Sequence, residues 1–432
     1  MRRNTVRSAA LLGSLVLCLT AVACSGESAT EQKSGGGGGG GDGKVTISHW
    51  QHQSDARAKL VEGFVDSYDD ANIDFQSIPY ESYFQKLGAA LEAGNGPCVF
   101  QLPANILQEF YGRGELAPVP DSIMSAADIE SAFTPASIRL LKIEGQYYAL
   151  PTDVQTMMLF YNDDLFKEAG LDPTQDFATW DDLVEAAKKL TKTSGDKMTQ
   201  AGMDLSASPY QLFYAAPTLA YPDGLVNDQT GDVQYDSEPG QQAWERITSL
   251  ITEDHVDDPE FLAEQSKFGL GKAGMTFKEF TFDGVYKLTA PDVHFSVHPA
   301  PPVTDDAAAP VASTSWSYAV SADCDDKDAA WKWVAYLTSE DAQRKWIEGG
   351  GELPSRTALL TDESLQDDPN VAAGFAALAE AEPYDSNGWD DAYAVQQKIW
   401  DEIVLNGTDV ATAVEQGADA ERDLYRSKGL LE

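Results

Sequence analysis

Strand-like and helix-like patterns alternate from residue 44 onward, and this alternation restricts the fold more than any other feature. Apolar residues at 45 and 47 alternate with polar ones, as in a half-buried strand, and apolar residues at helical spacing follow over 60–68. The same order recurs with strands expected over 73–78 and 98–102, each followed by a predicted helix. This order predicts an α/β fold in which helices cover both faces of a parallel sheet.

Polar and aromatic side chains stand at the ends of two predicted strands. Trp50, His52 and Gln53 come at the end of the first strand, and Gln101 comes at the end of the third. Ligands of such sheets bind beyond the carboxyl ends of the strands. These four residues are therefore candidate ligand contacts. For Trp50 and Gln101 the alternative is a structural position in the core.

Length and composition favour two folded domains that bind neither nucleic acid nor cofactor. The segment 44–432 is longer than the about 250–300 residues at which single cores stop growing. The formal net charge of −40 repels nucleic acid and anionic lipid headgroups. The histidines lack zinc-ligand spacing, and no strand is predicted before the dinucleotide-like glycines at 269, 271 and 274. We expect no metal, no cofactor and a monomeric protein.

The N-terminus has the pattern of an export signal followed by a tether. Arginines at 2, 3 and 7 precede an apolar run over 9–23 that is shorter than the about 20 residues a membrane span needs. The run ends in small residues at Cys24, which resembles the lipobox of bacterial lipoproteins. This resemblance implies a signal peptide over 1–23, lipidation of Cys24 and attachment to the extracellular face of the cell membrane. Residues 24–43 form a glycine-rich flexible linker. The alternative is a plain secretory signal.

Two cysteines remain in the body of the chain, Cys98 and Cys324. An isolated pair in an exported protein is a disulfide candidate, because disulfides persist outside the cytoplasm.

Six stretches, in order along the chain, resemble the extracellular solute-binding proteins of ABC importers, specifically the sugar-binding group that includes maltose-binding protein. They include GRGELAPV at 112–119 and GKAGMTF at 271–277, and the others lie at 81–103, 147–172, 179–191 and 315–356. The chain departs from the family at Cys98, where an aspartate usually follows Gly-Pro.

The resemblance implies a periplasmic-binding-protein-like fold with two α/β lobes, crossover hinge strands and a ligand cleft between the lobes. The N-terminal lobe is expected to comprise 44–152 plus 314–355, and the C-terminal lobe 153–313 plus 356–432. The crossovers are expected near Asp153, at 311–313 and at 353–356. In this topology the strand after the second crossover lies antiparallel beside the third strand, which implies a Cys98–Cys324 disulfide.

A sugar requires aromatic platforms for its C–H faces and polar side chains for its hydroxyls. The resemblance places further candidate ligand residues at the crossovers and the cleft-facing turns. For most of them the alternative is a core or backbone-bonding role. These candidates are Tyr83, Asp153, Glu279, Phe280, Trp316, Arg356, Tyr384 and Trp389.

The combined features predict a lipid-anchored substrate-binding protein without catalytic activity. It is expected to capture a mono- or oligosaccharide by hinge closure and deliver it to the membrane permease of an ABC importer. Two alternatives remain open. One is an exported glycoside hydrolase with a carboxylate pair, and the other is a cell-surface adhesion or scaffold protein.

Overall fold

The computed structural model describes residues 43–53, 55–205, 232–263, 265–301, 303, 311–383, 389–429 and 431. The predicted signal peptide, Cys24 and the linker up to residue 42 therefore lie outside the described residues. Residues 44–432 form one compact unit, separate from residues 1–43. None of the described helices combines the length and apolar composition needed to cross a membrane.

The first sheet has five strands in the order β2-β1-β3-β13-β6. Strands β1, β2 and β3 are parallel, as predicted, whereas β13 runs antiparallel to both β3 and β6. The strands are β1 (Thr46–His52), β2 (Asn72–Ile78), β3 (Val99–Pro103), β6 (Ala149–Pro151) and β13 (Trp316–Val320). The helices of this part are α1 (Asp55–Ser67), α2 (Tyr80–Glu92), α3 (Leu107–Gly112), α4 (Ala126–Ala132), α5 (Pro135–Ile138), α11 (Lys327–Leu337) and α12 (Glu340–Gly350).

The second sheet follows the order β15-β12-β7-β10-β9-β8, and β11 and β14 also pair with β7. Only β10–β9 and β12–β15 are parallel pairs among these strands. The strands are β7 (Asp153–Asn162), β8 (Lys192–Ser194), β9 (Lys197–Asp204), β10 (Ala273–Glu279), β11 (Phe295–His298), β12 (Val311–Thr314), β14 (Leu353–Pro354) and β15 (Ala381–Pro383). The helices are α6 (Asp163–Glu168), α7 (Trp180–Leu190), α9 (Glu238–Thr252), α10 (Phe282–Thr289), α13 (Pro369–Ala377), α14 (Trp389–Val404) and α15 (Val410–Ser427). A short hairpin joins β4 (Lys142–Ile143) to β5 (Gln146–Tyr147).

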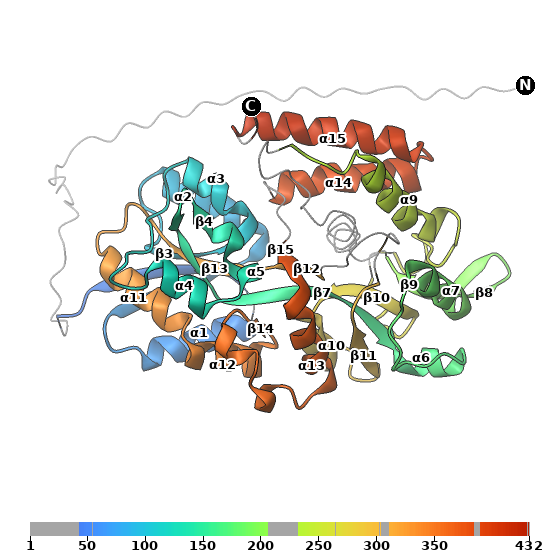
Figure 1. Ribbon diagram of the computed structural model, residues 1–432, viewed down its shortest axis with the longest axis horizontal. Helices are drawn as coiled ribbons and strands as arrows, with labels where there is room; N and C mark the ends of the chain where they lie inside the picture. Colours follow the sequence, from blue (N-terminus) through green and yellow to red (C-terminus); the bar gives the residue numbers. More distant parts are fainter. Residues whose placement is uncertain are drawn as a thin grey trace, which may run out of the picture. The chain divides into compact units, whose positions relative to one another are not determined.

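Strand β7 links the elements of the first sheet to those of the second. In Figure 1 it runs from the region of β13 toward β10. All ten of its residues are buried. The strand ends at Asn162. The Asn162 side chain accepts a hydrogen bond from the amide of Leu165 (3.1 Å), and this cap starts α6. A capping box of Thr179 with Asp182 starts α7.

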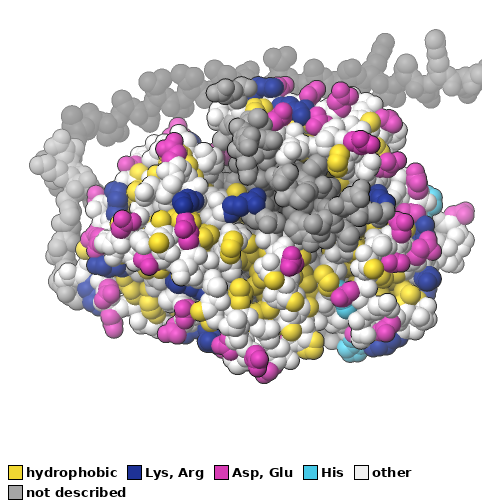
Figure 2. Space-filling model, in the orientation of Figure 1, with side chains coloured by type: hydrophobic (Ala, Val, Ile, Leu, Met, Phe, Trp, Pro, Cys, Tyr) yellow, Lys and Arg dark blue, Asp and Glu magenta, His cyan; other side chains and the backbone are white. Residues whose placement is uncertain are grey.

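Separate hydrophobic cores lie within the two groups of elements. One contains aromatic side chains of the first sheet and its helices, among them Phe64, Phe100 and Trp333. Two further clusters surround β7 and β10, on opposite faces of the second sheet. Acidic side chains are spread over the coloured parts of the face in Figure 2, with basic ones between them. This distribution matches the strongly negative net charge.

The disulfide between Cys98 and Cys324 is present, with 4.8 Å between the Cα atoms. Strand β13 lies antiparallel to β3 with Val320 opposite Val99. The amide of Ser321 also donates to the carbonyl of Cys98 (2.9 Å). The prediction made from the family topology is therefore confirmed, and the bond joins two distant chain segments at one sheet.

Candidate functional site

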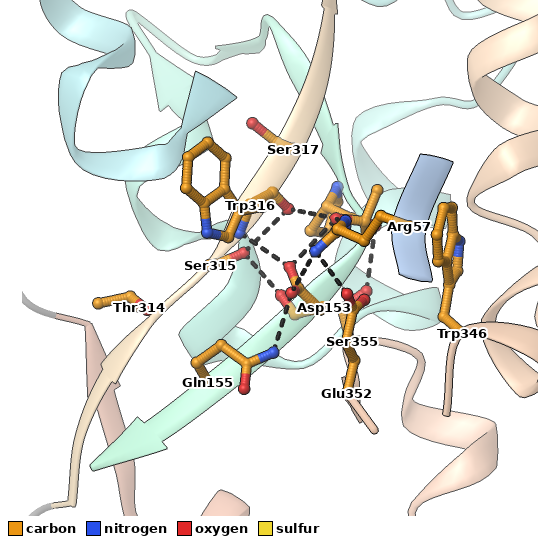
Figure 3. Close-up of polar contacts among 12 residues, drawn as sticks. Arg57, Asp153, Gln155, Thr314, Ser315, Trp316, Ser317, Trp346, Glu352 and Ser355 are labelled. Carbon is orange, nitrogen blue, oxygen red and sulfur yellow. Dashed lines mark hydrogen bonds and ion pairs between the residues drawn. The ribbon is translucent and has the colours of Figure 1, made fainter. Parts of the chain in front are cut away.

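A buried ionic network joins the three segments where the chain passes between the sheets (Figure 3). Nη1 of Arg57, from α1, lies 3.2 Å from Oδ2 of Asp153 at the start of β7 and 2.6 Å from Oε1 of Glu352 beside β14. Its Nη2 donates to Oγ1 of Thr152 (3.1 Å). Its guanidinium also lies over the ring of Trp346, 5.0 Å from the centroid. One cation therefore fixes two crossover segments against α1.

Asp153 has no hydrogen-bonding capacity left for a ligand in this arrangement. Its Oδ2 accepts from Arg57 and from Nε2 of Gln155 (2.9 Å), and its Oδ1 accepts from the amide of Trp316 (3.0 Å) and from Thr152 (3.1 Å). The side chain is fully buried. In this arrangement Asp153 positions the backbone of Trp316, and its contact with a ligand stays a prediction.

Two buried carboxylates share one guanidinium, and this arrangement determines their charge. Burial raises the pKa of Glu352 to about 8; the charge of Arg57 opposes this rise and the charge of Asp153 adds to it. Glu352 is therefore protonated at neutral pH. The network then contains one cation and one anion, which avoids the cost of an unpaired buried charge.

Four aromatic rings cluster next to this network. The imidazole of His52, at the end of β1, lies 4.5 Å from the ring of Trp316 and 5.4 Å from the ring of Tyr80. Phe84, one turn after Tyr80 in α2, is stacked against Trp316 with 6.4 Å between centroids. We call His52, Tyr80, Phe84 and Trp316 the aromatic cluster. It provides the flat apolar surfaces that sugar rings require.

His52 contributes a neutral imidazole to this cluster. Burial, reinforced by the positive charge of Arg57, lowers its pKa to about 4. Its Nδ1 lies 3.3 Å from the carbonyl oxygen of Gln53 and donates to it, so Nε2 of the neutral ring is an acceptor for a hydroxyl group.

The crossover strands add polar groups beside the aromatic cluster. Thr314, at the end of β12, pairs with Gln155 of β7 and donates its hydroxyl to Oε1 of Glu279 (3.4 Å). Oε1 of Gln155 is buried and has no hydrogen-bond partner within the described residues. Glu279 ends β10, so the second sheet contributes a carboxylate to the same region. Aromatic and polar groups from both sheets therefore meet at the crossovers.

Comparison with known proteins shows which family has this architecture. Residues 59–373 match the family model described as bacterial extracellular solute-binding protein. The chain belongs to this family. The body of this solute-binding protein is therefore extracellular or periplasmic.

Curated relatives match most of this solute-binding protein at low identity. The maltotriose-binding protein of Pyrococcus abyssi is 26% identical over 345 residues, which cover 78% of this chain and 72% of the relative. A putative binding protein of Brucella abortus is 24% identical over 364 residues, covering 82% and 86% of the two chains. An arabinooligosaccharide-binding protein of Halalkalibacterium halodurans is 28% identical over 178 residues, covering 41% of this chain and 38% of the relative.

Solved structures share the two-lobed fold. A solute-binding protein of Thermotoga lettingae bound to α-D-tagatose superposes with a TM-score of 0.75 at 22% identity, covering 88% of this chain and 99% of that chain. A substrate-binding protein of Listeria monocytogenes in complex with cycloalternan has a TM-score of 0.76 at 22% identity, covering 89% and 99%. At this identity the likeness establishes the two-lobed α/β fold alone.

Two of the other predicted ligand residues of this solute-binding protein, Tyr83 and Gln101, are buried in or beside the first sheet. Tyr83 is fully buried; its hydroxyl donates to the carbonyl of Gln101 (2.8 Å) and accepts from the amide of Gln101 (3.0 Å). Gln101 is also fully buried, and its side-chain amide has no hydrogen-bond partner in the described part of the chain. The Tyr83 hydroxyl therefore bonds the backbone of β3, and a ligand contact of Tyr83 stays a prediction.

Trp50 and Gln53 lie beside the aromatic cluster without joining it. Trp50 is half-buried, with Nζ of Lys86 4.7 Å from its ring centroid. Gln53 is exposed just after β1.

Two other expected ligand residues have packing roles. Phe280 is 1% exposed and belongs to the core around β7 and α10, because the turn after Glu279 directs it inward. Arg356 donates from Nε to the carbonyl of Thr338 (2.7 Å) and lies over the ring of Phe133. Ligand contacts of Phe280 and Arg356 stay predictions. Tyr384 and the side chain of Trp389 lie outside the described residues.

The sequence interpretation missed Tyr80, Phe84, Gln155 and Thr314. Tyr80 follows β2 by one residue, so the rule that placed His52 at a strand end also applies to Tyr80. Phe84 lies four residues later on the same helix and therefore on the same face. No local signal distinguishes Gln155 within an apolar strand.

Proposed function

We propose that this solute-binding protein is the lipid-anchored, sugar-binding subunit of an ABC importer. The observation that carries the proposal is the aromatic cluster, whose Trp316 is held through its backbone amide to Asp153 at the crossovers. The combination of aromatic surface, neutral imidazole and carboxylate suits a neutral polyhydroxyl ligand. Relatives named as maltotriose-binding and arabinooligosaccharide-binding proteins support the same ligand class.

Capture by hinge closure follows from the placement of these groups. The lobes proposed here are 44–152 plus 314–355 and 153–313 plus 356–432. The strands of the first sheet lie within the first of these lobes, whereas β14, which falls within 314–355, pairs with β7 of the second sheet. A sugar that contacts His52 from the first sheet and Glu279 from the second stabilises the closed state relative to the open one. The membrane permease would then recognise the closed form, and the monomer suffices for this role.

A thermal-shift screen over mono- and oligosaccharides, including maltotriose and arabinotriose, tests sugar binding. A sugar at 100 times its dissociation constant stabilises the folded state by about 2.7 kcal/mol, which raises the melting temperature measurably. Small-angle scattering of the same samples should show compaction with the binding sugar. A screen in which no sugar raises the melting temperature contradicts the proposal.

The family favours a binding protein over a hydrolase or a scaffold protein. Incubation with chromogenic glycosides separates the first alternative, because a hydrolase releases the chromophore and a binding protein does not. A scaffold protein would keep its scattering profile in every sugar of the screen.

The lipid anchor is tested at Cys24. We expect Cys24→Ala to appear in the medium or to remain uncleaved, because the thiol is the attachment point that the lipobox pattern supplies. The matched control is Cys18→Ala, which changes a cysteine inside the predicted signal and should remain in the membrane fraction. A mature, unlipidated N-terminus at another residue excludes the anchor.

A further inference from the structure

A groove of about 690 Å³ lies between α2 and α3, outside the aromatic cluster. Phe84, Gly88 and Leu91 line it from α2, and Glu109 and Arg113 line it from the α3 side. Its volume is within the roughly 300–1,000 Å³ of small-molecule sites. The C-terminal helices also reach this groove, through Asp391 of α14 and Lys428 after α15.

The groove and the aromatic cluster share one residue. Phe84 lines the groove and is also stacked on Trp316, with an interplanar angle of 19°. A ligand on the aromatic cluster that is longer than the cluster itself would therefore extend along α2 into the groove.

The side chains that line the groove favour one chemical class of extended ligand. Phe84, Ile106 and Phe110 supply apolar surface, whereas the rim is charged. Nζ of Lys428 lies 2.9 Å from Asp391 and 3.3 Å from Glu109. Arg113 pairs with Glu109 at 2.6 Å. These charged groups are paired with one another along the rim, and a hydroxyl group, which both donates and accepts, can bond either member of such a pair.

Charge and polarity argue against other ligand classes. The lining contains five carboxylates, on Glu92, Glu109, Glu115, Asp323 and Asp391, against two basic residues, so an anionic ligand would be repelled. A wholly apolar ligand would remove water from these ion pairs and offer them no hydrogen bond in return. A neutral chain of sugar units avoids both costs.

We infer that the groove binds the further units of an oligosaccharide whose first units lie on the aromatic cluster. The protein is then selective for oligosaccharides over monosaccharides and short chains. This inference rests on the proposed function, because it assigns the ligand's length at the same site.

A glycine in the groove allows a direct block. Gly88 lies in α2, and a Cβ added there meets no atom within 4 Å, so Gly88→Phe places a ring in the groove without a clash at its base. Gly63 of α1 has the same open surroundings and does not line the groove. Gly63→Phe is therefore the matched control.

Calorimetric titrations should use the series from maltose to maltopentaose and the series from arabinobiose to arabinopentaose. For the series that binds, we expect the wild type and Gly63→Phe to gain at least tenfold in affinity from the shortest to the longest sugar. Gly88→Phe should lose this gain and keep its affinity for the disaccharide. The retained disaccharide affinity shows that the variant is folded.

The inference is overturned if the wild type binds all chain lengths equally, if only monosaccharides bind, or if Gly88→Phe keeps the full gain. In each of these outcomes a sugar still binds, so the proposed function stands. Failure of every sugar to bind the wild type overturns the proposed function and this inference with it.

Discussion

Replacement of Glu352 by glutamine should change how stability depends on pH. Glu352 is 3% exposed and bonded to Arg57, and burial raises its pKa to about 8 from an ordinary value of 4.5. The folded protein therefore keeps this proton at pH values where the unfolded chain has released it. The resulting stabilisation is complete below about pH 4.5 and is lost as the pH rises toward 8.

The magnitude follows from linkage. Between the two pKa values the folded state holds about one more proton, so the free energy of unfolding falls by about 1.4 kcal/mol per pH unit. The slope becomes shallower near pH 8, and the loss from pH 6 to pH 7.5 is about 2 kcal/mol. A glutamine side chain at this position would carry no titrating proton and would retain an oxygen that accepts from Arg57. The variant should therefore lack this loss.

Urea unfolding at several pH values between 6 and 7.5 measures this difference. The wild type should lose about 2 kcal/mol relative to Glu352→Gln over this range. Glu348→Gln, which changes an exposed carboxylate of α12, serves as the control and should follow the wild type. Parallel curves for the wild type and Glu352→Gln would refute the assignment of a buried, protonated Glu352.

Three further changes test the site and the packing. Trp316→Ala should weaken binding of the screened sugar at least tenfold in calorimetric titration, with an unchanged melting temperature; intact affinity would make Trp316 a packing residue only. Serine at both Cys98 and Cys324 should lower the free energy of unfolding in urea by up to about 5 kcal/mol, because the bond closes a separation of 226 residues, and should leave sugar affinity intact. Equal stability of both forms would contradict this entropic argument. Gly202→Ala should lower the melting temperature, because the added Cβ would overlap the carbonyl oxygen of Ala187 in α7. Such overpacking costs about 1–3 kcal/mol. An unchanged melting temperature would show that α7 can move away from β9.

The sequence by itself determined the features that depend on local interactions. Strands β1 to β3 and their helices follow from the spacing of apolar residues, because one face of each element must be buried. The capping box at Thr179 is a contact between near neighbours and is readable from their types. The disulfide needed the family's strand order as well, because the two cysteines are distant in sequence. The rule for strand ends selected His52, whose ring centroid lies 4.5 Å from that of Trp316.

Only the tertiary structure decided how the residues at the crossovers are used. Asp153 has the residue type of a sugar ligand, but Arg57 and the backbone amide of Trp316 approach it from distant parts of the chain and occupy its oxygens. Phe280 has the type of a platform, but the turn after β10 buries it. The spacing of apolar residues predicts which face of a helix or strand is buried. It does not predict which other element packs on that face, because this is set by contacts between residues far apart in the sequence. For this reason the buried ionic network around Arg57 and the groove between α2 and α3 are visible only in the folded chain.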